Sequence, residues 1–368
     1  MIIGVPKEIK DQENRVAVIP GAVAELAKKN EVYIEKGAGL GSGIEDSDYI
    51  EAGAKILDSA KEVWEKADFI YKVKEPLEEE YQYLREGQIL YTYLHLASNE
   101  KLAKELVDKK VTAIGYETLN LDGKLPLLRP MSEIAGRMAV QEGARYLTSP
   151  AGGRGILLQG VPGVRPAHVV IVGAGVVGTG ATRIAVGMGA RVTVLDVNID
   201  ALTRLTNIFQ DKIETLYSNP LNIEESVKTA DLVISTVLIP GRKAPQLIKE
   251  EYVKEMKEGS VIVDVAIDQG GSTDLTKNHP TSHTDPIFTK YGVTHYAVAN
   301  IPGAVAMTST YALSNATTRY AKAIAEMGLK EESEKFPEIK SGINTFNGYI
   351  AYEPVAEDLD MEYKEAAL

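Results

Sequence analysis

The sequence predicts an α/β protein with two doubly wound domains, each a parallel sheet covered by helices. Short apolar segments alternate with helical stretches from residue 1 to about residue 127, and the alternation resumes at His168. Such alternation is typical of parallel strands joined by crossover helices. The chain has 368 residues, which is enough for two domains that each bury a core of their own.

The first part of the chain supplies one sheet. Pro130 and Ser132 then open a helical run over residues 133–147, for which Ser132 is the expected N-cap.

Within the first part of the chain, the acidic run 78–80 is expected to be the solvated start of a helix. The expected strands cover residues 2–5, 32–35, 69–73, 89–94 and 111–116, and the expected helices begin at Gly21, Ser59 and Asn99.

The second part supplies the other sheet. Residues 308–327 are expected to form one long helix, rich in Ala, Thr and Tyr, whose position suggests a return to the first domain. We therefore expect a discontinuous first domain, residues 1–127 and 307–368, and a second domain at residues 128–306. The expected strands of the second domain cover residues 169–172, 192–195, 232–236, 261–265 and 294–298.

Composition narrows the class of protein. Hydrophobic residues make up 44% of the chain and charged residues 25%, as in globular proteins, and no apolar run is long enough to span a membrane. The N-terminus begins directly with a strand and lacks the pattern of a signal peptide, so we expect a cytoplasmic location. The net charge of −12 argues against a nucleic-acid partner.

The sequence gives little evidence for a metal site or for a catalytic nucleophile. The chain has no cysteine, which excludes disulfides, thiolate metal sites and cysteine nucleophiles. His279 and His283 lie four residues apart near Asp285, but Pro280 between them favours a loop over a helical zinc site, and we expect no metal. Neither a G-x-S-x-G nor a Walker A pattern occurs.

A glycine-rich turn follows the first strand of the second domain. Gly173 allows a tight turn, Gly175 lets the backbone approach a pyrophosphate, and Gly178 lets the next helix pack closely on the strand. The N-terminus of that helix then faces the phosphates. Asp196 ends the second strand 18 residues after Gly178, where a carboxylate can bind both ribose hydroxyls and repel a 2′-phosphate. This context favours an NAD site over an NADP site and over an empty structural turn.

Four charged or titratable residues lie at the ends of expected strands, namely Arg15, Lys74, His95 and Asp268. Ligands of open α/β sheets bind outside the carboxyl ends of strands, so we expect these side chains to converge on one crevice. The planar guanidinium of Arg15 and the compact ammonium group of Lys74 could both bind a substrate carboxylate. The alternative for each residue is an ion pair on the protein surface. His95 suits proton exchange or a buried core position, and Asp268 could cap a turn instead.

Taken together, these motifs resemble the alanine dehydrogenase family across nearly the whole chain. The resemblance implies reversible, NAD-dependent oxidative deamination of L-alanine to pyruvate and ammonium. It implies a Rossmann NAD-binding domain, a flavodoxin-like substrate domain and a homo-hexamer. The matching segments begin at Ile3 (IGVPKE), Asn14 (NRVA), Lys72 (KVKEP), Tyr93 (YLHLA), Met131 (MSEIAG), Gly173 (GAGVVG), Val265 (VAIDQGG) and Thr308 (TSTYAL).

The resemblance also implies roles for individual residues. Arg15 and Lys74 would hold the substrate carboxylate, and His95 and Asp268 would take catalytic roles that the sequence does not divide between them. The implied cofactor contacts are Ser132, Gly173, Gly175, Val177, Gly178, Asp196, Ser218, Val237, Leu238, Ile267, Val298 and Asn300.

The chain departs from the family pattern in two places. Ser272 stands where the family often has cysteine, and the loop 272–280 is about two residues longer, with Lys277 near a common arginine position. Gly180 lies inside the expected dinucleotide helix, where it should cost about 1 kcal/mol relative to alanine unless close packing requires it.

Two other functions remain open from the sequence. The same patterns are similar to the nucleotide-binding part of proton-translocating transhydrogenase, and more distantly to saccharopine-type dehydrogenases. The first alternative is a nucleotide-binding subunit that needs a membrane partner, and the second is a dehydrogenase for a larger amino acid.

Overall fold

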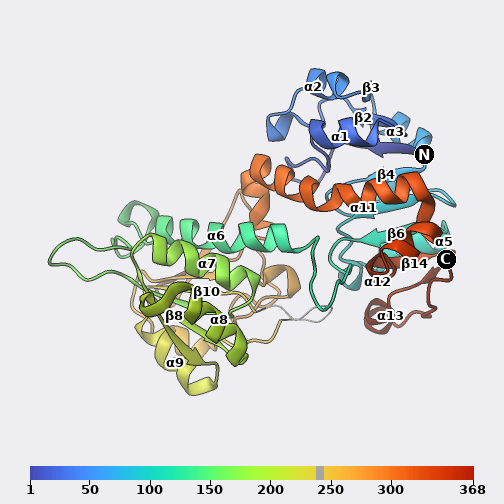
Figure 1. Cartoon of the computed structure of the whole chain (residues 1–368). Coiled ribbons are helices and arrows are strands. Elements are labelled where there is room, and N and C mark those ends of the chain that lie inside the picture. Colours follow the sequence, from blue (N-terminus) through green and yellow to red (C-terminus); the bar gives the residue numbers. More distant parts are fainter. Residues whose placement is uncertain (238–243) are drawn as a thin grey trace. The chain divides into compact units, whose positions relative to one another are not determined.

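The computed structural model describes residues 1–237 and 244–368, which form two compact units (Figure 1). The first unit combines Met1–Met131 with Val305–Leu368, so both ends of the chain, blue and red in Figure 1, contribute to it. The second unit is Ser132–Ala304. Leu238, one of the implied cofactor contacts, lies outside the described residues.

The first unit contains an eight-stranded sheet in the order β15-β14-β6-β5-β4-β1-β2-β3. Apart from the three-residue edge strand β3, its parallel strands follow the flavodoxin-like order 2-1-3-4-5, as the resemblance implied. The last two strands are antiparallel additions from the C-terminal segment. The strands are β1 (Ile2–Val5), β2 (Glu31–Glu35), β3 (Lys55–Leu57), β4 (Phe69–Tyr71), β5 (Ile89–Thr92), β6 (Thr112–Gly115), β14 (Ile343–Phe346) and β15 (Tyr349–Ile350).

Helices join and cover this sheet. Trp64, Leu90, Leu102 and Leu106 belong to a fully buried apolar cluster in this unit. The helices are α1 (Pro20–Leu26), α2 (Asp46–Glu51), α3 (Ala60–Lys66), α4 (Glu78–Tyr81), α5 (Glu100–Asp108), α11 (Ala306–Lys335), α12 (Glu338–Gly342) and α13 (Glu353–Leu359).

The second unit contains a seven-stranded sheet in the order β12-β13-β11-β10-β7-β8-β9. Its parallel strands follow the Rossmann order 3-2-1-4-5-6, and only β12 is antiparallel. The strands are β7 (His168–Val172), β8 (Arg191–Asp196), β9 (Ile213–Tyr217), β10 (Leu232–Ser235), β11 (Val261–Asp264), β12 (Ile287–Lys290) and β13 (Val293–Tyr296), and the helices are α6 (Arg129–Tyr146), α7 (Val176–Gly187), α8 (Ile199–Phe209), α9 (Pro220–Thr229) and α10 (Glu250–Lys254).

The start of helix α6 differs from the expectation. Helix α6 begins at Arg129, so Ser132 lies inside the helix and is not its N-cap. Pro130 explains the earlier start, because a proline in the first turn needs no backbone N–H partner and its fixed φ angle suits a helix.

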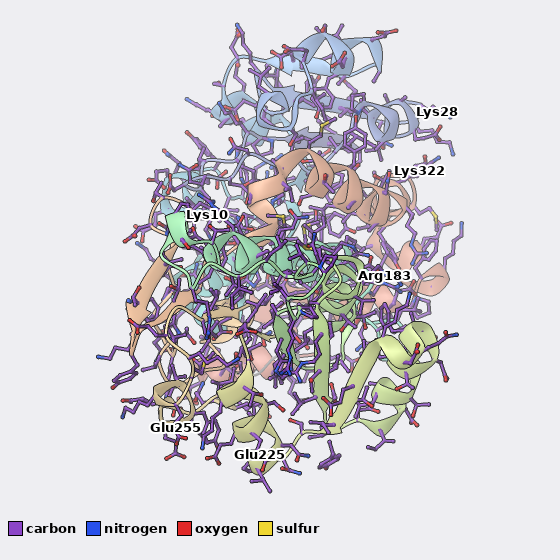
Figure 2. The ribbon with its side chains drawn as sticks, turned by 90° about the vertical axis from the view of Figure 1, so that its left-hand side faces the viewer. Lys10, Lys28, Arg183, Glu225, Glu255 and Lys322 are labelled. Carbon is purple, nitrogen blue, oxygen red and sulfur yellow. The ribbon has the colours of Figure 1, made fainter. Side chains whose placement is uncertain are left out.

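The long C-terminal helix forms where the sequence predicted it. Backbone angles are non-helical at Gly328 (φ 77°), immediately after the predicted end at residue 327, and a second helical segment continues to Lys335. Within the first unit, α11 packs against α1. Glu25 of α1 accepts hydrogen bonds from Lys28 and from Lys322 of α11, and both lysines are labelled in Figure 2.

Within the described ranges, no helix has the length and apolar composition required to cross a membrane.

Candidate active site

The glycine-rich turn of the second unit has the shape predicted from the sequence. Gly173 has a φ of +112°, a left-handed conformation that favours glycine. A Cβ atom on Gly178 would overlap the carbonyl oxygen of Gly173, so only glycine lets α7 pack this closely on the turn. A Cβ atom on Gly175, by contrast, would meet nothing within 4 Å. The backbone at Gly175 therefore borders open space at the N-terminus of α7, as a pyrophosphate cradle requires.

Asp196 is tied to this turn. One oxygen of its half-buried carboxylate accepts the backbone N–H of Ala174 at 2.6 Å, and the other accepts that of Asn198 at 2.8 Å. The Arg204 guanidinium also donates to the Ala174 carbonyl oxygen at 2.8 Å. The turn and the end of β8 are thus fixed to each other, and the residues present fit a dinucleotide ribose and pyrophosphate.

The glycines of helices α6 and α7 allow their backbones to approach closely. A Cβ atom on Gly136 would overlap the carbonyl oxygen of Val177, and one on Gly180 would lie 3.2 Å from the carbonyl oxygen of Glu133. This contact gives a packing reason for Gly180, because an alanine methyl group would press on the Glu133 carbonyl oxygen and a neighbour would have to shift by a few tenths of an ångström. Close packing offsets the intrinsic cost of glycine in a helix.

The other implied cofactor residues lie in or beside strand ends and helix starts of the second unit. Ser218 follows β9 and donates its backbone N–H to the Asp196 carbonyl oxygen at 3.0 Å. Asn300 adopts a positive φ of 68°, which is unusual for a residue other than glycine. Val177 lies in α7, Ser132 in α6, Ile267 in a short 3-10 helix, Val237 just after β10 and Val298 just after β13.

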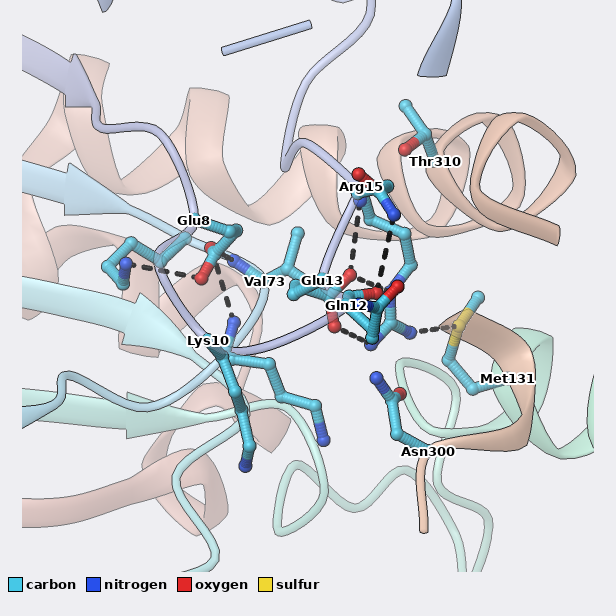
Figure 3. Close-up of polar contacts among 12 residues, drawn as sticks. Glu8, Lys10, Gln12, Glu13, Arg15, Val73, Met131, Asn300 and Thr310 are labelled. Atoms are coloured by element: carbon cyan, nitrogen blue, oxygen red, sulfur yellow. Dashed lines mark hydrogen bonds and ion pairs between the residues drawn. The ribbon is translucent and has the colours of Figure 1, made fainter. Parts of the chain in front are cut away.

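Arg15 is buried, with 2% of its surface exposed, and it binds a carboxylate from its own loop. Its Nε donates to Glu13 Oε1 at 2.6 Å and its Nη2 lies 2.5 Å from Glu13 Oε2 (Figure 3). Its Nη1 donates to the sulfur of Met131 at 3.2 Å. Burial by itself lowers the pKa of Arg15, but Glu13 reverses this effect and holds it above its usual value. The surface ion pair considered from the sequence is therefore wrong for this arginine.

Lys74 is also buried, with 6% of its surface exposed, which excludes the surface alternative here too. Its backbone N–H donates to Glu8 Oε1 at 3.3 Å and its carbonyl oxygen accepts from Thr92 at 2.8 Å. The neighbouring Glu75 is mostly buried, which opposes its ionisation, yet Lys74, Lys10 and His95 together lower its pKa. Lys74 and His95 therefore both lie close enough to Glu75 to influence its ionisation.

His95 follows β5 by three residues and has a φ of 50°, in the left-handed region that histidine rarely adopts. Glu117 accepts the backbone N–H groups of Leu94 and His95, the latter at 2.6 Å, and so holds this strained turn. The imidazole is half-buried and stacks on Tyr93, with 6.0 Å between ring centres. Strained backbone that its surroundings hold in place is typical of functional sites.

Asp268 lies in a short 3-10 helix (Ile267–Gln269) and is exposed. The turn that the sequence analysis considered for it is capped instead by Asp264, which is fully buried. Asp264 accepts the backbone N–H groups of Ala266 and Ser272 and the hydroxyl groups of Ser272 and Thr276. Asp268 is therefore not needed to shape its loop.

The histidines near residue 280 do not gather into a cluster. His279 stacks on Phe288, and His283 Nε2 lies 3.1 Å from the Asn300 carbonyl oxygen. In the part of the chain that the structure describes, no group of three or more His, Cys, Asp or Glu side chains is arranged to hold a metal ion.

Sequence reasoning missed several carboxylates and an aromatic residue around these groups. Glu13, Glu117 and Tyr93 contact Arg15 or the His95 turn. Glu13 and Tyr93 stand close to motif residues in the sequence, whereas nothing in the sequence pointed to Glu117. The expectation that the acidic run 78–80 is solvated is wrong for Glu80, which is 3% exposed. It is buried because it pairs with Lys72, whose Nζ lies 2.8 Å from Glu80 Oε1.

The chain is similar to known proteins along its whole length. Residues 4–135 match the family model "Alanine dehydrogenase/PNT, N-terminal domain", and residues 139–353 match "Alanine dehydrogenase/PNT, C-terminal domain". The alanine dehydrogenase of Methanococcus maripaludis is 59% identical over 368 residues, covering 100% of this chain and 98% of that protein. The alanine dehydrogenase of Bacillus subtilis is 56% identical over 367 residues, covering 100% and 97%.

Solved structures show the same similarity. An L-alanine dehydrogenase has a TM-score of 0.93 at 48% identity, covering 98% of this chain and 99% of that chain. The transhydrogenase from Sinorhizobium meliloti has a TM-score of 0.82 at 26% identity, covering 95% and 100%.

Proposed function

Because this chain belongs to the alanine dehydrogenase/PNT family, we propose that it catalyses the reversible, NAD-dependent oxidative deamination of L-alanine. The products are pyruvate, ammonium, NADH and a proton, with one water consumed. The observation that carries this proposal is identity of 59% and 56% with alanine dehydrogenases over the full length, against 26% with a transhydrogenase. The transhydrogenase alternative is correspondingly weaker.

The second unit supplies the residues that would hold the dinucleotide. Gly175 and the N-terminus of α7 would face the pyrophosphate, and Asp196 would accept hydrogen bonds from the ribose hydroxyls. A 2′-phosphate would meet the negative charge of Asp196, so we expect a preference for NAD over NADP. Bound NAD supplies the hydride acceptor for the Cα hydrogen of alanine.

The first unit supplies the residues that would hold the substrate carboxylate, Arg15 and Lys74. Both side chains are buried, so their charges attract a carboxylate with little screening by water. Glu13 fixes the plane of the Arg15 fork by engaging its Nε edge. A fixed guanidinium plane and a second positive charge would set the orientation of the substrate. Correct orientation of the substrate would supply much of the rate enhancement.

His95 and Asp268 would handle protons and the amino group. Loss of hydride from Cα gives a cationic imine, and water then adds to it before ammonium leaves. In one assignment His95 moves the proton of the added water while Asp268 binds the amino group, and in the other the two roles are exchanged. The half-exposed imidazole of His95 suits exchange with solvent, and the exposed carboxylate of Asp268 suits binding of a cation.

Initial rates measured by NADH absorbance test this function. With pyruvate, ammonium and NADH, the purified protein should oxidise NADH, and it should be slower with larger 2-keto acids. NAD binding without alanine-dependent reduction would favour the transhydrogenase-like alternative. Faster turnover of a larger amino acid than of alanine would instead favour a dehydrogenase for a larger amino acid.

Substitutions at the two cations test how the substrate is held. Arg15→Lys and Lys74→Ala should each lower kcat/KM by about 100-fold, or about 3 kcal/mol, because each leaves a charge poorly paired in a dry site. Lys28→Ala is the control, since Lys28 is an exposed lysine of the same unit whose partner is Glu25. Unchanged kcat/KM in Arg15→Lys or Lys74→Ala would remove that residue from the substrate site.

The family resemblance also leads us to propose a homo-hexamer. Light scattering on the purified protein should then give a mass of about six chains, and a monomeric mass would contradict it.

A further inference from the structure

Three charged side chains in the first unit form a buried cluster that the proposed chemistry does not use. Glu8, Lys72 and Glu80 are 8%, 1% and 3% exposed. Lys72 Nζ lies 3.2 Å from Glu8 Oε2 and 2.8 Å from Glu80 Oε1, so two carboxylates share one ammonium group. Removing three charges from water is expensive, and an apolar core of the same volume is often as stable or more stable. Stability alone therefore does not explain the cluster.

Glu8 and Glu80 differ in what their remaining contacts hold. The second oxygen of Glu80 accepts the backbone N–H of Leu77 at 3.0 Å, next to α4. The first oxygen of Glu8 accepts the backbone N–H of Val73 at 2.6 Å and that of Lys74 at 3.3 Å (Figure 3). Glu8 thus binds directly to the backbone that carries Lys74, whereas Glu80 binds to a segment three residues farther on.

The same short segment is also held from other strands. Thr92 donates its hydroxyl to the Lys74 carbonyl oxygen at 2.8 Å, and Tyr116 donates its hydroxyl to that of Lys72 at 2.8 Å. Both donors are fully buried. Strand β4 ends at Tyr71, so residues 72–74 lie beyond the regular strand and depend partly on such side chains for their conformation. Among Glu8, Thr92 and Tyr116, whose side chains bind this backbone, Glu8 is the charged one.

We propose that Glu8 is a positioning residue for the substrate carboxylate, acting through the backbone of Lys74. This inference rests on the proposed function, in which Lys74 binds that carboxylate. The Glu8 carboxylate fixes the direction in which the Lys74 side chain leaves the backbone, and Lys72 stabilises the charge of Glu8. Burial raises the pKa of Glu8 to about 6 even though Lys72 opposes the shift, which agrees with a carboxylate kept in place at some energetic cost.

Glu8→Gln and Glu80→Gln are a matched pair for the test. Each carboxylate accepts from Lys72 with one oxygen and from backbone N–H with the other, so each glutamine must turn its NH₂ group toward a donor. Each substitution also removes one negative charge from the same cluster. Only Glu8→Gln, however, disturbs the backbone of Lys74.

The measurements are the Kd of pyruvate for the protein–NADH complex, by NADH fluorescence, and kcat and KM for pyruvate. Glu8→Gln should weaken pyruvate binding at least about tenfold, because small misplacements of a binding group have large effects, while Glu80→Gln changes it less than about twofold. The Kd of NADH should be unchanged in both variants. In a Lys74→Ala background, Glu8→Gln should have no further effect on pyruvate binding.

Each other outcome has a definite meaning. Equal weakening by the two glutamines, or an effect of Glu8→Gln that persists with Lys74→Ala, would overturn the role of Glu8 while leaving the proposed function standing. Wild-type protein without alanine-dependent NAD reduction would overturn the proposed function and this inference with it. If Glu8→Gln does not fold, Glu8→Asp against Glu80→Asp gives the same comparison with the charge retained.

Discussion

At the scale of single residues, Asp196 is the clearest determinant of cofactor choice. Its carboxylate lies at the end of β8 and binds the backbone of Ala174 in the glycine-rich turn. Asp196→Ala should weaken NAD binding and reduce the preference for NAD over NADP by about tenfold or more, since the repulsive charge is gone. Titration of both dinucleotides by protein fluorescence measures this. Asp200→Ala, an exposed aspartate in the first turn of α8, should leave the preference unchanged.

A wild-type protein that already prefers NADP would show that the interpretation of Asp196 is wrong.

The site residues predicted from the sequence are those whose chemistry needs a strand end, and their roles stay predictions. Arg15, Lys74 and His95 follow apolar strands, so the sheet itself predicts their place. Their buried partners could not be predicted, because a glutamate in a loop or helix start is usually solvated. Glu8 and Glu80 are both buried, and both pair with Lys72, which is buried as well.

At the scale of elements, substitutions of Gly175 and Gly178 distinguish an effect on NAD binding from an effect on folding stability. Gly175→Ala adds a methyl group to open space, so the protein should keep its melting temperature but lose at least about tenfold in NAD affinity. Gly178→Ala forces the methyl group against the Gly173 carbonyl oxygen, so it should also lower stability by about 1–3 kcal/mol. Thermal unfolding with and without NAD measures both effects. Full NAD affinity in Gly175→Ala would contradict a pyrophosphate at this turn.

Strands that are buried on both faces are the easiest to predict from the sequence. All four residues of β10 and of β11 are buried, and the first three of each strand are apolar, a pattern typical of central parallel strands. The strands β3, β9 and β12 lie at or near sheet edges, carry lysine or glutamate and are partly exposed, so their apolar pattern is weak. These three strands form because they hydrogen-bond to a neighbouring strand, and a local sequence pattern does not predict that pairing.

At the scale of the whole molecule, the pH dependence of stability should reflect His295. Burial lowers the pKa of this histidine from 6.5 to about 4. The native state therefore binds fewer protons than the unfolded state between about pH 6.5 and 4, and the free energy of unfolding decreases as the pH falls through this window. Between pH 7 and 5 this histidine alone should account for a loss of about 2 kcal/mol.

Denaturant unfolding of His295→Phe tests this contribution. A phenylalanine can keep the stacking on Phe288 but cannot take up a proton, so the variant should lose about 2 kcal/mol less than wild type between pH 7 and 5. His283→Phe is the control, because His283 is a histidine of the same unit that lies in a loop, where its Nε2 contacts the Asn300 carbonyl oxygen. Parallel pH profiles for wild type and His295→Phe would contradict the prediction.

The overall fold was the most predictable level. The alternation of strands and helices predicted both parallel sheets, and the flavodoxin-like and Rossmann strand orders are both present. The C-terminal return was suggested only by the position of the long helix. The antiparallel strands β14 and β15, which extend the first sheet, went unnoticed because both are short and because β14 pairs with β6, a strand more than 200 residues earlier.

We propose that Arg15 and Lys74 together hold the carboxylate of a small amino or keto acid. A crystal structure of the protein with NADH and pyruvate tests it most directly. The pyruvate carboxylate should lie within hydrogen-bond distance of the Arg15 guanidinium and of the Lys74 ammonium group. A carboxylate bound elsewhere, with Arg15 still paired only with its own loop, would contradict it.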